Sequence, residues 1–393
     1  MEGALFPFFK ASKPLLGRSR TSLGFWPSST SMPQTSPQSS LVQSLQERID
    51  SLYKPEEYPA CRDQAERWSR TKPLAGLTVL DATPVFDNTF TKYVALMRAG
   101  ARLLAGIDDV MPRSDDSVAY LKAAGIPVVR PETVTEPIDL VLDCAGAFAS
   151  ITPHLGYVEL TRSGVAKYRD AVKPVFVADA GRIKRIETCL GTGESYFRAM
   201  AQLGYGSWQG RKLVIFGSGK VGTGLITYAH RNGCDTTVVT RLSDITPETA
   251  SLAQRVIAAD DAAAIREAVL AADAVVTATG VAGALKDSCP AEVFMASHAL
   301  IANMGVEDEF GEALPADRVL QGKKPLNFIL HDPTRIDYID ATMALHNAGA
   351  LYLVEHPELH GKAGLIDPPA ALEEEILAVS RRDGRIADEL EGI

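Results

Sequence analysis

From residue 77 onwards, short apolar runs alternate with longer segments in which apolar residues recur every three to four positions. A short apolar run bounded by turn residues predicts a buried strand, and the longer period predicts a helix with one apolar face. In the first half of the chain the expected strands are residues 77–82, 101–105, 128–129 and 140–142, and the expected helices are residues 91–99 and 117–124. Gly100 and Gly125 directly follow these helices, as is common where a helix ends. Strands that alternate with helices predict a parallel sheet.

A second run of the same kind begins at residue 212. Its expected strands are residues 213–216, 236–240, 274–277, 299–302 and 328–330. Helices over residues 339–355 and 370–380 follow, and we expect both to pack back on the first domain. The sequence therefore predicts an α/β fold with two doubly wound, Rossmann-like parallel-sheet domains and a cleft between them. The expected boundaries are 46–190 with 340–393 for a substrate domain and 191–339 for a dinucleotide-binding domain.

Residues 1–45 differ from the rest of the chain because they are rich in Ser and basic residues and poor in acidic ones. Such a composition predicts an unstructured segment. One interpretation is that residues 1–31 are an organelle transit peptide; the other, which we favour, is an upstream extension with Met32 as the working start. The expected compartment is the cytoplasm, or an organelle if the first interpretation holds.

The composition fits a globular protein that binds small molecules. Hydrophobic residues make up 46% and charged residues 23% of the 393 residues, a length that favours two domains. The net charge of -9, without a dense basic run in the body of the chain, argues against nucleic acid and anionic membranes as partners. No apolar stretch approaches the roughly 20 residues that span a bilayer. The five cysteines are widely spaced and include no Cys-x-x-Cys pair, so we expect a reducing compartment and no metal site.

The most specific motif follows the expected strand 213–216 and opens an expected helix. It reads Gly217, Ser218, Gly219, Lys220, Val221 and Gly222. In this strand-turn-helix context, the Gly-x-Gly-x-x-Gly pattern is a strong indication of dinucleotide binding. The first glycine permits a tight turn, the second lets the backbone approach a pyrophosphate, and the third lets helix and strand pack closely. Backbone N–H groups at the start of the helix would then bind the phosphates.

The residues at the end of the next strand bear on the choice of cofactor. NAD-binding folds normally place Asp or Glu there, whereas this chain has Thr240, Arg241 and Ser243. A guanidinium cannot accept hydrogen bonds from a ribose diol but can bind a 2′-phosphate, with Ser243 as a further donor. The cofactor is therefore expected to be NAD(P), with NADP favoured. The alternative is that Arg241 is a solvated loop charge and that Asp244 binds the ribose.

Four further segments extend the pattern beyond one motif. They are Glu-Leu-Thr-Arg-Ser-Gly at 159–164, Gly-Thr-Gly-Glu-Ser at 191–195, Thr-Ala-Thr-Gly at 277–280 and Asn-Met-Gly at 303–305. Together they make the stretch from about residue 140 to residue 305 resemble the S-adenosylhomocysteine hydrolase family, a group within the formate/glycerate dehydrogenase-like proteins.

The resemblance implies a split first domain, a central cofactor domain and a homo-oligomer. It also implies that Thr161 and Ser163 lie against the cofactor and that Asn303 binds the nicotinamide carboxamide. Thr279 and Gly280 belong to the cofactor site by the same comparison.

The positions that carry the hydrolase reaction depart from the family pattern. The comparison puts Ile183 where the family has a lysine and Leu160 where it has a glutamate. Cys144 replaces an aspartate, and Glu187 keeps an acidic group. Because Ile and Leu side chains cannot transfer a proton, the hydrolase reaction lacks its general bases. The sequence therefore predicts that adenosylhomocysteine is not hydrolysed.

Lys184, Glu187 and His331 remain as candidate catalytic residues. Lys184 is one position from the missing lysine and could act as a general base if it reaches the cleft. The alternative is a solvated lysine in a basic cluster with Arg182 and Arg185, which could equally bind a substrate carboxylate. His331 follows the expected strand 328–330 and is a candidate acid.

Four other groups are expected to be structural. Cys144 is interpreted as a small buried thiol, because no cation is nearby in sequence to lower its pKa. His346 is expected on a helix surface, as are His356 and His360. His331 and Asp332 should not form a relay pair, since adjacent residues on a strand point in opposite directions.

These features predict an NAD(P)-dependent oxidoreductase that exchanges hydride with a small polar substrate in the cleft, related to adenosylhomocysteine hydrolase but not identical with it. Two alternatives stay open. One is an adenosylhomocysteinase-like hydrolase or lyase that uses tightly bound NAD, and the other is a dinucleotide-sensing protein without catalysis.

Overall fold

The computed structural model describes residues 37–390, which fall within one compact unit. Helix α1 (Pro37–Leu52) begins inside the segment that the sequence assigned to an extension. That boundary is wrong because Leu45 and Ile49 form one apolar face and are fully buried in the core around helix α3 (Phe90–Arg98). The transit-peptide hypothesis for residues 1–31 lies outside the described residues.

Seven parallel strands form the larger sheet, in the order β12-β6-β5-β4-β1-β2-β3. Their bounds are β1 (Thr78–Asp81), β2 (Arg102–Gly106), β3 (Val128–Val129), β4 (Leu140–Asp143), β5 (Gly156–Glu159), β6 (Pro174–Val177) and β12 (Gly364–Ile366). The chain runs outward from β1 to β3 and then returns to the other side of β1 as β4, so the order reverses between β1 and β4. In open parallel sheets, ligands bind outside the strand ends at such a reversal.

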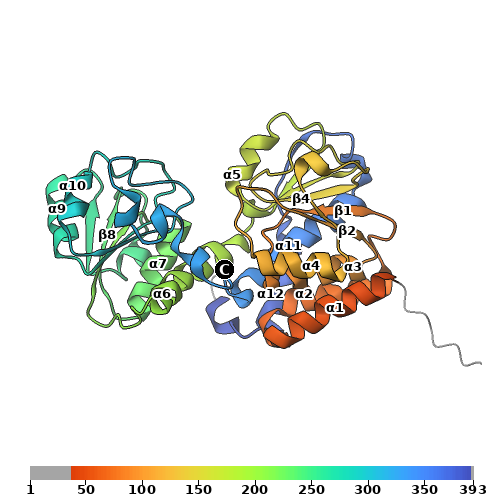
Figure 1. Ribbon diagram of the computed structural model, residues 1–393, viewed down its shortest axis with the longest axis horizontal. Coiled ribbons are helices and arrows are strands. Elements are labelled where there is room, and N and C mark those ends of the chain that lie inside the picture. The colour runs from red at the N-terminus through yellow and green to blue at the C-terminus, as the bar shows by residue number, and fades with distance from the viewer. Residues whose placement is uncertain (1–36, 391–393) are drawn as a thin grey trace, which may run out of the picture. The chain divides into compact units, whose positions relative to one another are not determined.

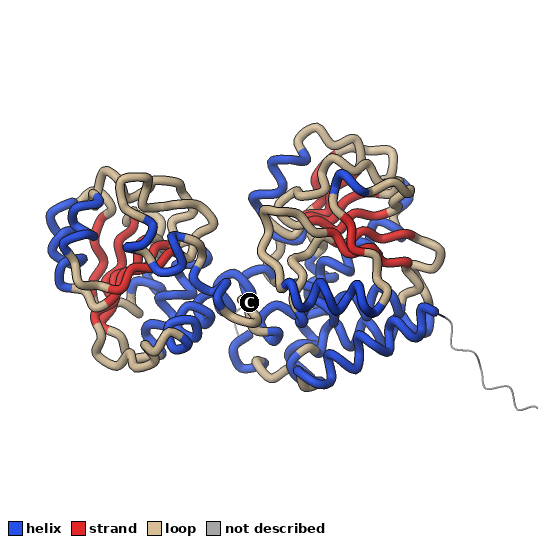
Figure 2. Tube along the Cα trace, in the orientation of Figure 1, coloured by secondary structure: helices blue, strands red, loops and turns tan. Residues whose placement is uncertain are grey.

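Helices cover one face of this sheet (Figure 2). They are α1, α2 (Pro59–Thr71), α3, α4 (Asp115–Ala124), α11 (Ile336–Glu355) and α12 (Ala370–Asp383). Side chains alternate across a strand, so Val79 packs against these helices while Leu80 packs into a second core on the other face. That second core lies under the 144–151 loop and α5 (Arg162–Val165). As expected from the sequence, α11 packs on β4 and β5, and α12 packs on α2 and α11.

Five parallel strands form the second sheet, in the order β11-β10-β7-β8-β9. Their bounds are β7 (Lys212–Phe216), β8 (Asp235–Thr240), β9 (Arg255–Ala258), β10 (Ala274–Thr277) and β11 (Leu300–Asn303). Helices α6 (Thr192–Gln202) and α7 (Lys220–Arg231) pack on one face; α9 (Ala262–Ala271) and α10 (Ala291–Ala296) pack on the other (Figure 1). Both sheets are parallel and doubly wound, which confirms the predicted α/β fold class.

Two local predictions are wrong. Residues 328–330 are not a strand, because Leu326–Ile329 form a 3-10 turn between Pro325 and Pro333, and proline has no N–H for a ladder. His346 is not on a helix surface, since α11 is buried on most of its sides and His346 is fully inaccessible to solvent. His356 and His360 are half-buried, each with a ring nitrogen next to a main-chain carbonyl of α11.

Within residues 37–390, no helix combines the length and the apolar character that crossing a bilayer requires.

Candidate cofactor and substrate site

The loop between β7 and α7 has the shape that its three glycines predict. Gly217 has φ 101°, and a Cβ atom there would lie 2.5 Å from the carbonyl oxygen of Ala278. A Cβ atom on Gly222 would lie 2.2 Å from the carbonyl oxygen of Gly217. At Gly219, by contrast, no atom of the described structure lies within 4 Å of the Cβ position. The outer glycines therefore allow close packing, and a side chain at the middle one would point into open space.

The residues that the sequence predicts to select the cofactor meet at the end of β8. Ser218 Oγ and Thr240 Oγ1 are 2.8 Å apart, and Ser218 Oγ also donates to the carbonyl of Asp244. Arg241 Nε donates to the carboxylate of Asp244 over 2.7 Å, although the arginine side chain is 78% exposed. Ser243 Oγ donates to the same carboxylate. Arg241 and Asp244, the two residues considered for the end of the cofactor that carries the adenosine ribose, thus form an ion pair with each other. Such an exposed pair is weak enough for a ligand to separate.

The backbone N–H groups of Thr279 and Gly280, after β10, donate hydrogen bonds to a side chain that the sequence did not point to. Glu309 is fully buried, and its carboxylate accepts from the N–H of Thr279 (2.8 Å) and of Gly280 (2.7 Å). The loop after β10 is therefore held in place by an internal acid. No spacing pattern in the sequence marks Glu309, because its partners are backbone groups about 30 residues away.

Asn303, at the end of β11, is fully buried and its amide is saturated. Its Oδ1 accepts from Thr277 Oγ1 and from the N–H of Gly305, and its Nδ2 donates to the carbonyls of Glu307 and Lys323. A side-chain amide has two donors and two acceptor sites. This arrangement differs from the implied role, because it leaves Asn303 no capacity for a nicotinamide carboxamide.

A pocket of about 260 Å³ lies at the carboxyl ends of the larger sheet's central strands. Loops after β1, β2, β4 and β5 contribute to its lining, which is the position expected at the reversal of strand order. Val221 of the glycine loop and Met304 after β11 line the same pocket. Residues of the predicted dinucleotide loop and residues after the strands of the larger sheet therefore line the same pocket.

Lys184 and Glu187 both line this pocket. A π-helical turn, Ile186–Gly191, carries Glu187, and such turns are frequent at functional sites. Lys184 is 3% exposed, and its Nζ donates to both oxygens of Glu187 over 2.9 and 2.7 Å. Burial acts to lower the pKa of Lys184, but the attraction of Glu187 outweighs it and leaves that pKa raised. Lys184 is therefore an ammonium ion at neutral pH, not a free base.

Thr161 also lines the pocket, and its hydroxyl contacts the buried carboxylate of Glu159. Glu159 is fully buried and accepts from the N–H groups of Ala145 and Gly146 and from the hydroxyl of Thr161. Burial raises the pKa of Glu159 although these hydrogen bonds oppose the shift. Ser163 is exposed on the next turn and donates to Thr161 Oγ1 over 3.3 Å.

Behind the pocket lies a neutral histidine. His346 Nε2 is 2.9 Å from the carbonyl oxygen of Val158, which can only accept, so this nitrogen carries the proton. His346 Nδ1 faces the hydroxyl of Thr83, a pocket-lining residue, over 3.4 Å. Burial holds the pKa of His346 well below its usual value, and Lys92 and Lys184 lower it further. Cys144 lines the pocket too, and burial raises the pKa of its thiol, so it is not a thiolate nucleophile.

The remaining candidates lie elsewhere. The side chain of His331 is 61% exposed and contacts Asp87 and Asp332 over 3.1 and 3.3 Å; it does not line the pocket. The expectation that His331 and Asp332 point apart is wrong, because they lie in a loop and not on a strand. Arg182 pairs with Glu374, and neither it nor exposed Arg185 lines the pocket. Among residues 37–390, no group of three or more His, Cys, Asp or Glu side chains could hold a metal ion.

The sequence matches no protein-family model and no curated protein sequence. Solved structures with similarity to the chain include one subunit of the dipicolinate synthase from Bacillus halodurans, at 12% identity, a TM-score of 0.43, and coverage of 73% of this chain and 98% of that one. A transhydrogenase from Sinorhizobium meliloti is similar at 14% identity and a TM-score of 0.39, with coverage of 74% of this chain and 99% of that one.

Proposed function

We propose that this protein is an NAD(P)-dependent oxidoreductase that interconverts a carbonyl group and an alcohol. Residues 191–339 would bind the dinucleotide, and residues 46–190 with 340–393 would bind the substrate. The observation that carries the proposal is the loop at 217–222, in which the first and third glycines are sterically required while the second faces open space. We further propose that the relation to the S-adenosylhomocysteine hydrolase family concerns the cofactor fold and homo-oligomer formation, and not the reaction.

The pair Lys184–Glu187 supports the reaction class. An ammonium has three donors, and Glu187 takes two, so one N–H of Lys184 is left for a substrate oxygen. A carbonyl oxygen accepts from that N–H, and an alcohol can donate to Glu187. A bound nicotinamide dinucleotide would supply or take up the hydride. During reduction Lys184 would give its proton to the carbonyl oxygen as the C–H bond forms. Alcohol oxidation would require that Lys184 first lose its proton, which its raised pKa disfavours at neutral pH.

The pocket does not support the hydrolase alternative. Leu160 and Cys144, at the positions where the resemblance expects acids, line the pocket and are buried. Neither side chain is a carboxylate that could take a proton from a ribose or a water. For the cofactor itself we propose NADP; the exposed guanidinium of Arg241 after β8, which could bind a 2′-phosphate, supports this choice.

The test measures cofactor binding by calorimetry and hydride transfer by nicotinamide absorbance, with a panel of ketones and alcohols. Lys184→Met should lower turnover by about 100-fold or more, because it removes the proton donor and the partner of Glu187. It should leave cofactor affinity unchanged, because Lys184 lies outside the loop at 217–222. Lys362→Met, at an exposed lysine outside the pocket, is the matched control.

The raised pKa of Lys184 fixes the expected pH dependence. Lys184 stays protonated through neutral pH, so the rate of carbonyl reduction should not change with pH in that range. The rate should fall only when the pH rises past the ordinary lysine pKa of roughly 10.4. A wild-type protein that binds neither NAD nor NADP contradicts the whole proposal. Cofactor binding without turnover of any compound would replace it by the dinucleotide-sensing function.

A further inference from the structure

The charges around the pocket indicate what kind of substrate it can take. Among the described residues that line it, the side chains charged at neutral pH are Lys184 and Glu187. They form an ion pair with each other, so the lining carries no net charge. A buried carboxylate or phosphate needs an opposing cation, because its loss of hydration costs several kcal/mol or more.

Three arginines that could have served an anionic substrate are engaged outside the pocket. Arg182, which the sequence offered as a carboxylate ligand, pairs with Glu374. Arg48 donates to Asp87 over 2.7 Å. Arg113 donates to the carbonyl of Asp108 and faces Asp115. None of the three lines the pocket.

The neutral polar groups of the lining are mostly committed to the protein as well. Thr89 Oγ1 donates to the carbonyl of Pro84, and Asn88 Nδ2 donates to the carbonyl of Thr334. Thr192 Oγ1 donates to the carbonyl of Glu187, and Thr161 Oγ1 donates to Glu159. Since these donors are spent, they do not favour a substrate with many hydroxyl groups, such as a sugar.

The surfaces left to hold the body of the substrate are apolar. Around the strand ends of the larger sheet they are Pro84, Phe86, Met111, Pro112 and Leu160. Met343 of α11 lines the same volume. Burial of apolar surface is favourable by roughly 25 cal/mol per Å², so this lining selects an apolar molecule.

We infer that the substrate is an uncharged carbonyl compound, or the corresponding alcohol, with an apolar body, and not a keto acid or a phosphorylated compound. The carbonyl oxygen would face Lys184, and the apolar body would contact Leu160 and its neighbours. This inference rests on the proposed oxidoreductase function and replaces the small polar substrate that the sequence suggested by a largely apolar one.

The experiment compares ligands that differ only by a carboxylate. Acetophenone with phenylglyoxylate and cyclohexyl methyl ketone with cyclohexylglyoxylate are titrated by saturation-transfer NMR, a method suited to weak binding, after saturation with NADP+, which cannot reduce the ketones. The wild-type protein should bind each neutral ketone at least tenfold more tightly than its acid.

Val306→Arg supplies the missing cation. Val306 lines the pocket and is 86% exposed, so an arginine there does not disturb the core. The variant should bind both acids about threefold or more tightly than wild type does, within the range of an exposed ion pair. Val172→Arg, at a 66% exposed valine outside the pocket, should change nothing.

Two results separate this inference from the proposed function. If NADP+ binds but wild type prefers the acids, or binds neither ketone, the substrate class is wrong while the cofactor assignment stands. If NADP+ does not bind at all, the proposed function fails first; the comparison repeated without cofactor then still reports whether the pocket prefers neutral ligands.

Discussion

Lys184 and Lys92 show how differently two buried lysines can behave. Both are nearly inaccessible to solvent and both face a carboxylate, Glu187 for Lys184 and Asp81 for Lys92. Burial lowers the pKa of Lys92 well below its usual value, whereas the two contacts to Glu187 keep the pKa of Lys184 raised. Lys184 also lines a pocket, so it keeps both its charge and access to a ligand.

Arg241 is the residue that should decide between NADP and NAD. A charged hydrogen bond to a 2′-phosphate contributes on the order of 1.5 to 3 kcal/mol, so NADP should bind roughly tenfold or more tightly than NAD. Arg241→Glu should reverse the preference, because a carboxylate repels the phosphate and accepts from the ribose hydroxyls. Calorimetry of both cofactors, repeated at higher salt, measures this difference.

Arg255→Glu serves as the control for Arg241→Glu, since Arg255 is an exposed arginine at the start of β9, whereas Arg241 follows the carboxyl end of the neighbouring strand β8. A wild-type preference for NAD that Arg241→Glu leaves unchanged would show that Asp244 recognises the ribose.

At the scale of secondary-structure elements, glycines allow α6, α7 and the π-helical turn at 186–191 to pack closely against one another. A Cβ atom on Gly224 of α7 would lie 1.8 Å from the carbonyl oxygen of Cys189 in the π-helical turn. A Cβ atom on Gly193 of α6 would lie 2.4 Å from the main chain of Gly224. The turn that carries Glu187 is thus packed directly against α7, the helix that starts at the predicted dinucleotide loop. This packing places the Lys184–Glu187 ion pair near the predicted cofactor site.

Two substitutions in the loop between β7 and α7 should separate binding from folding. Gly219→Val points into open space, so the protein should fold with an unchanged thermal midpoint and lose at least 100-fold in cofactor affinity. Gly222→Ala collides with backbone, so the thermal midpoint itself should fall by several degrees. Calorimetry and thermal unfolding of both variants give the answer. Unchanged cofactor affinity in folded Gly219→Val would show that the loop does not bind the dinucleotide.

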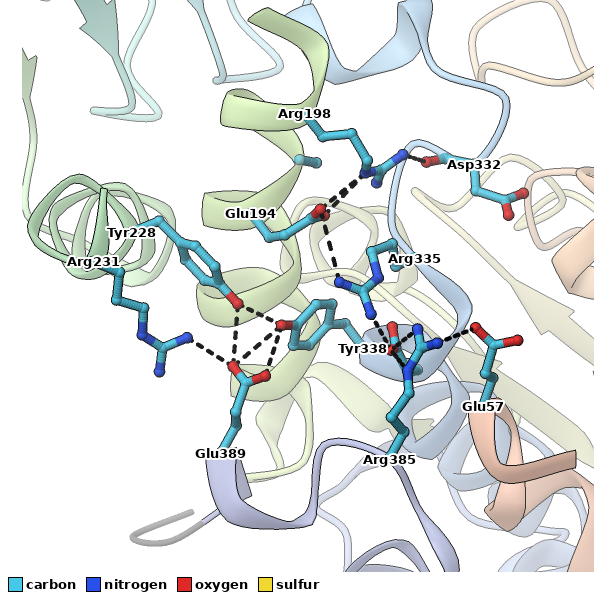
Figure 3. Close-up of polar contacts among 12 residues, drawn as sticks. Glu57, Glu194, Arg198, Tyr228, Arg231, Asp332, Arg335, Tyr338, Arg385 and Glu389 are labelled. Carbon is cyan, nitrogen blue, oxygen red and sulfur yellow. Dashed lines mark hydrogen bonds and ion pairs between the residues drawn. The ribbon is translucent and has the colours of Figure 1, made fainter. Parts of the chain in front are cut away.

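At the scale of the whole molecule, an ion network joins distant parts of the chain (Figure 3). Asp337, at the start of α11, accepts from Arg335 over 2.5 Å and from Arg385 over 2.7 Å. Arg335 also lies 4.0 Å from Glu194 of α6. Beside it, the hydroxyls of Tyr228 (α7) and Tyr338 (α11) donate to Glu389 in the last described turn, as does Arg231 of α7. The network ties α6 and α7 of the smaller sheet to α11 and the C-terminal segment.

Asp337→Ala should destabilise the protein more than loss of a surface pair does. The Asp337 side chain is 1% exposed and serves two arginines that are 33% and 44% exposed, so we expect the free energy of unfolding to fall by about 2 kcal/mol. Glu267→Ala removes an exposed pair with Arg255 and should cost less than about 1 kcal/mol. Urea denaturation of both variants compares the two losses. Equal losses would show that the network around Asp337 adds no stability.

Local patterns in the sequence determined the fold class and the geometry of the glycine loop at 217–222. Apolar runs such as Leu213 to Phe216 specify buried strands wherever the chain goes, and the glycine spacing at 217–222 encodes a turn whose geometry depends on its immediate neighbours. The family resemblance singles out Lys184 and Glu187, and the structure shows that they interact within one turn, three residues apart.

Only the tertiary structure decided which polar groups remain available. The side-chain amide of Asn303 makes all of its hydrogen bonds within the protein, to Thr277, Gly305, Glu307 and Lys323. The carboxylate of Glu309 accepts from the backbone N–H groups of Thr279 and Gly280 after β10. His346 reaches the pocket wall from α11, more than 260 residues beyond Thr83. His331 lies outside the pocket although it follows an apolar run. Hydrogen-bond capacity and burial depend on neighbours that come from remote segments, and no local pattern records them.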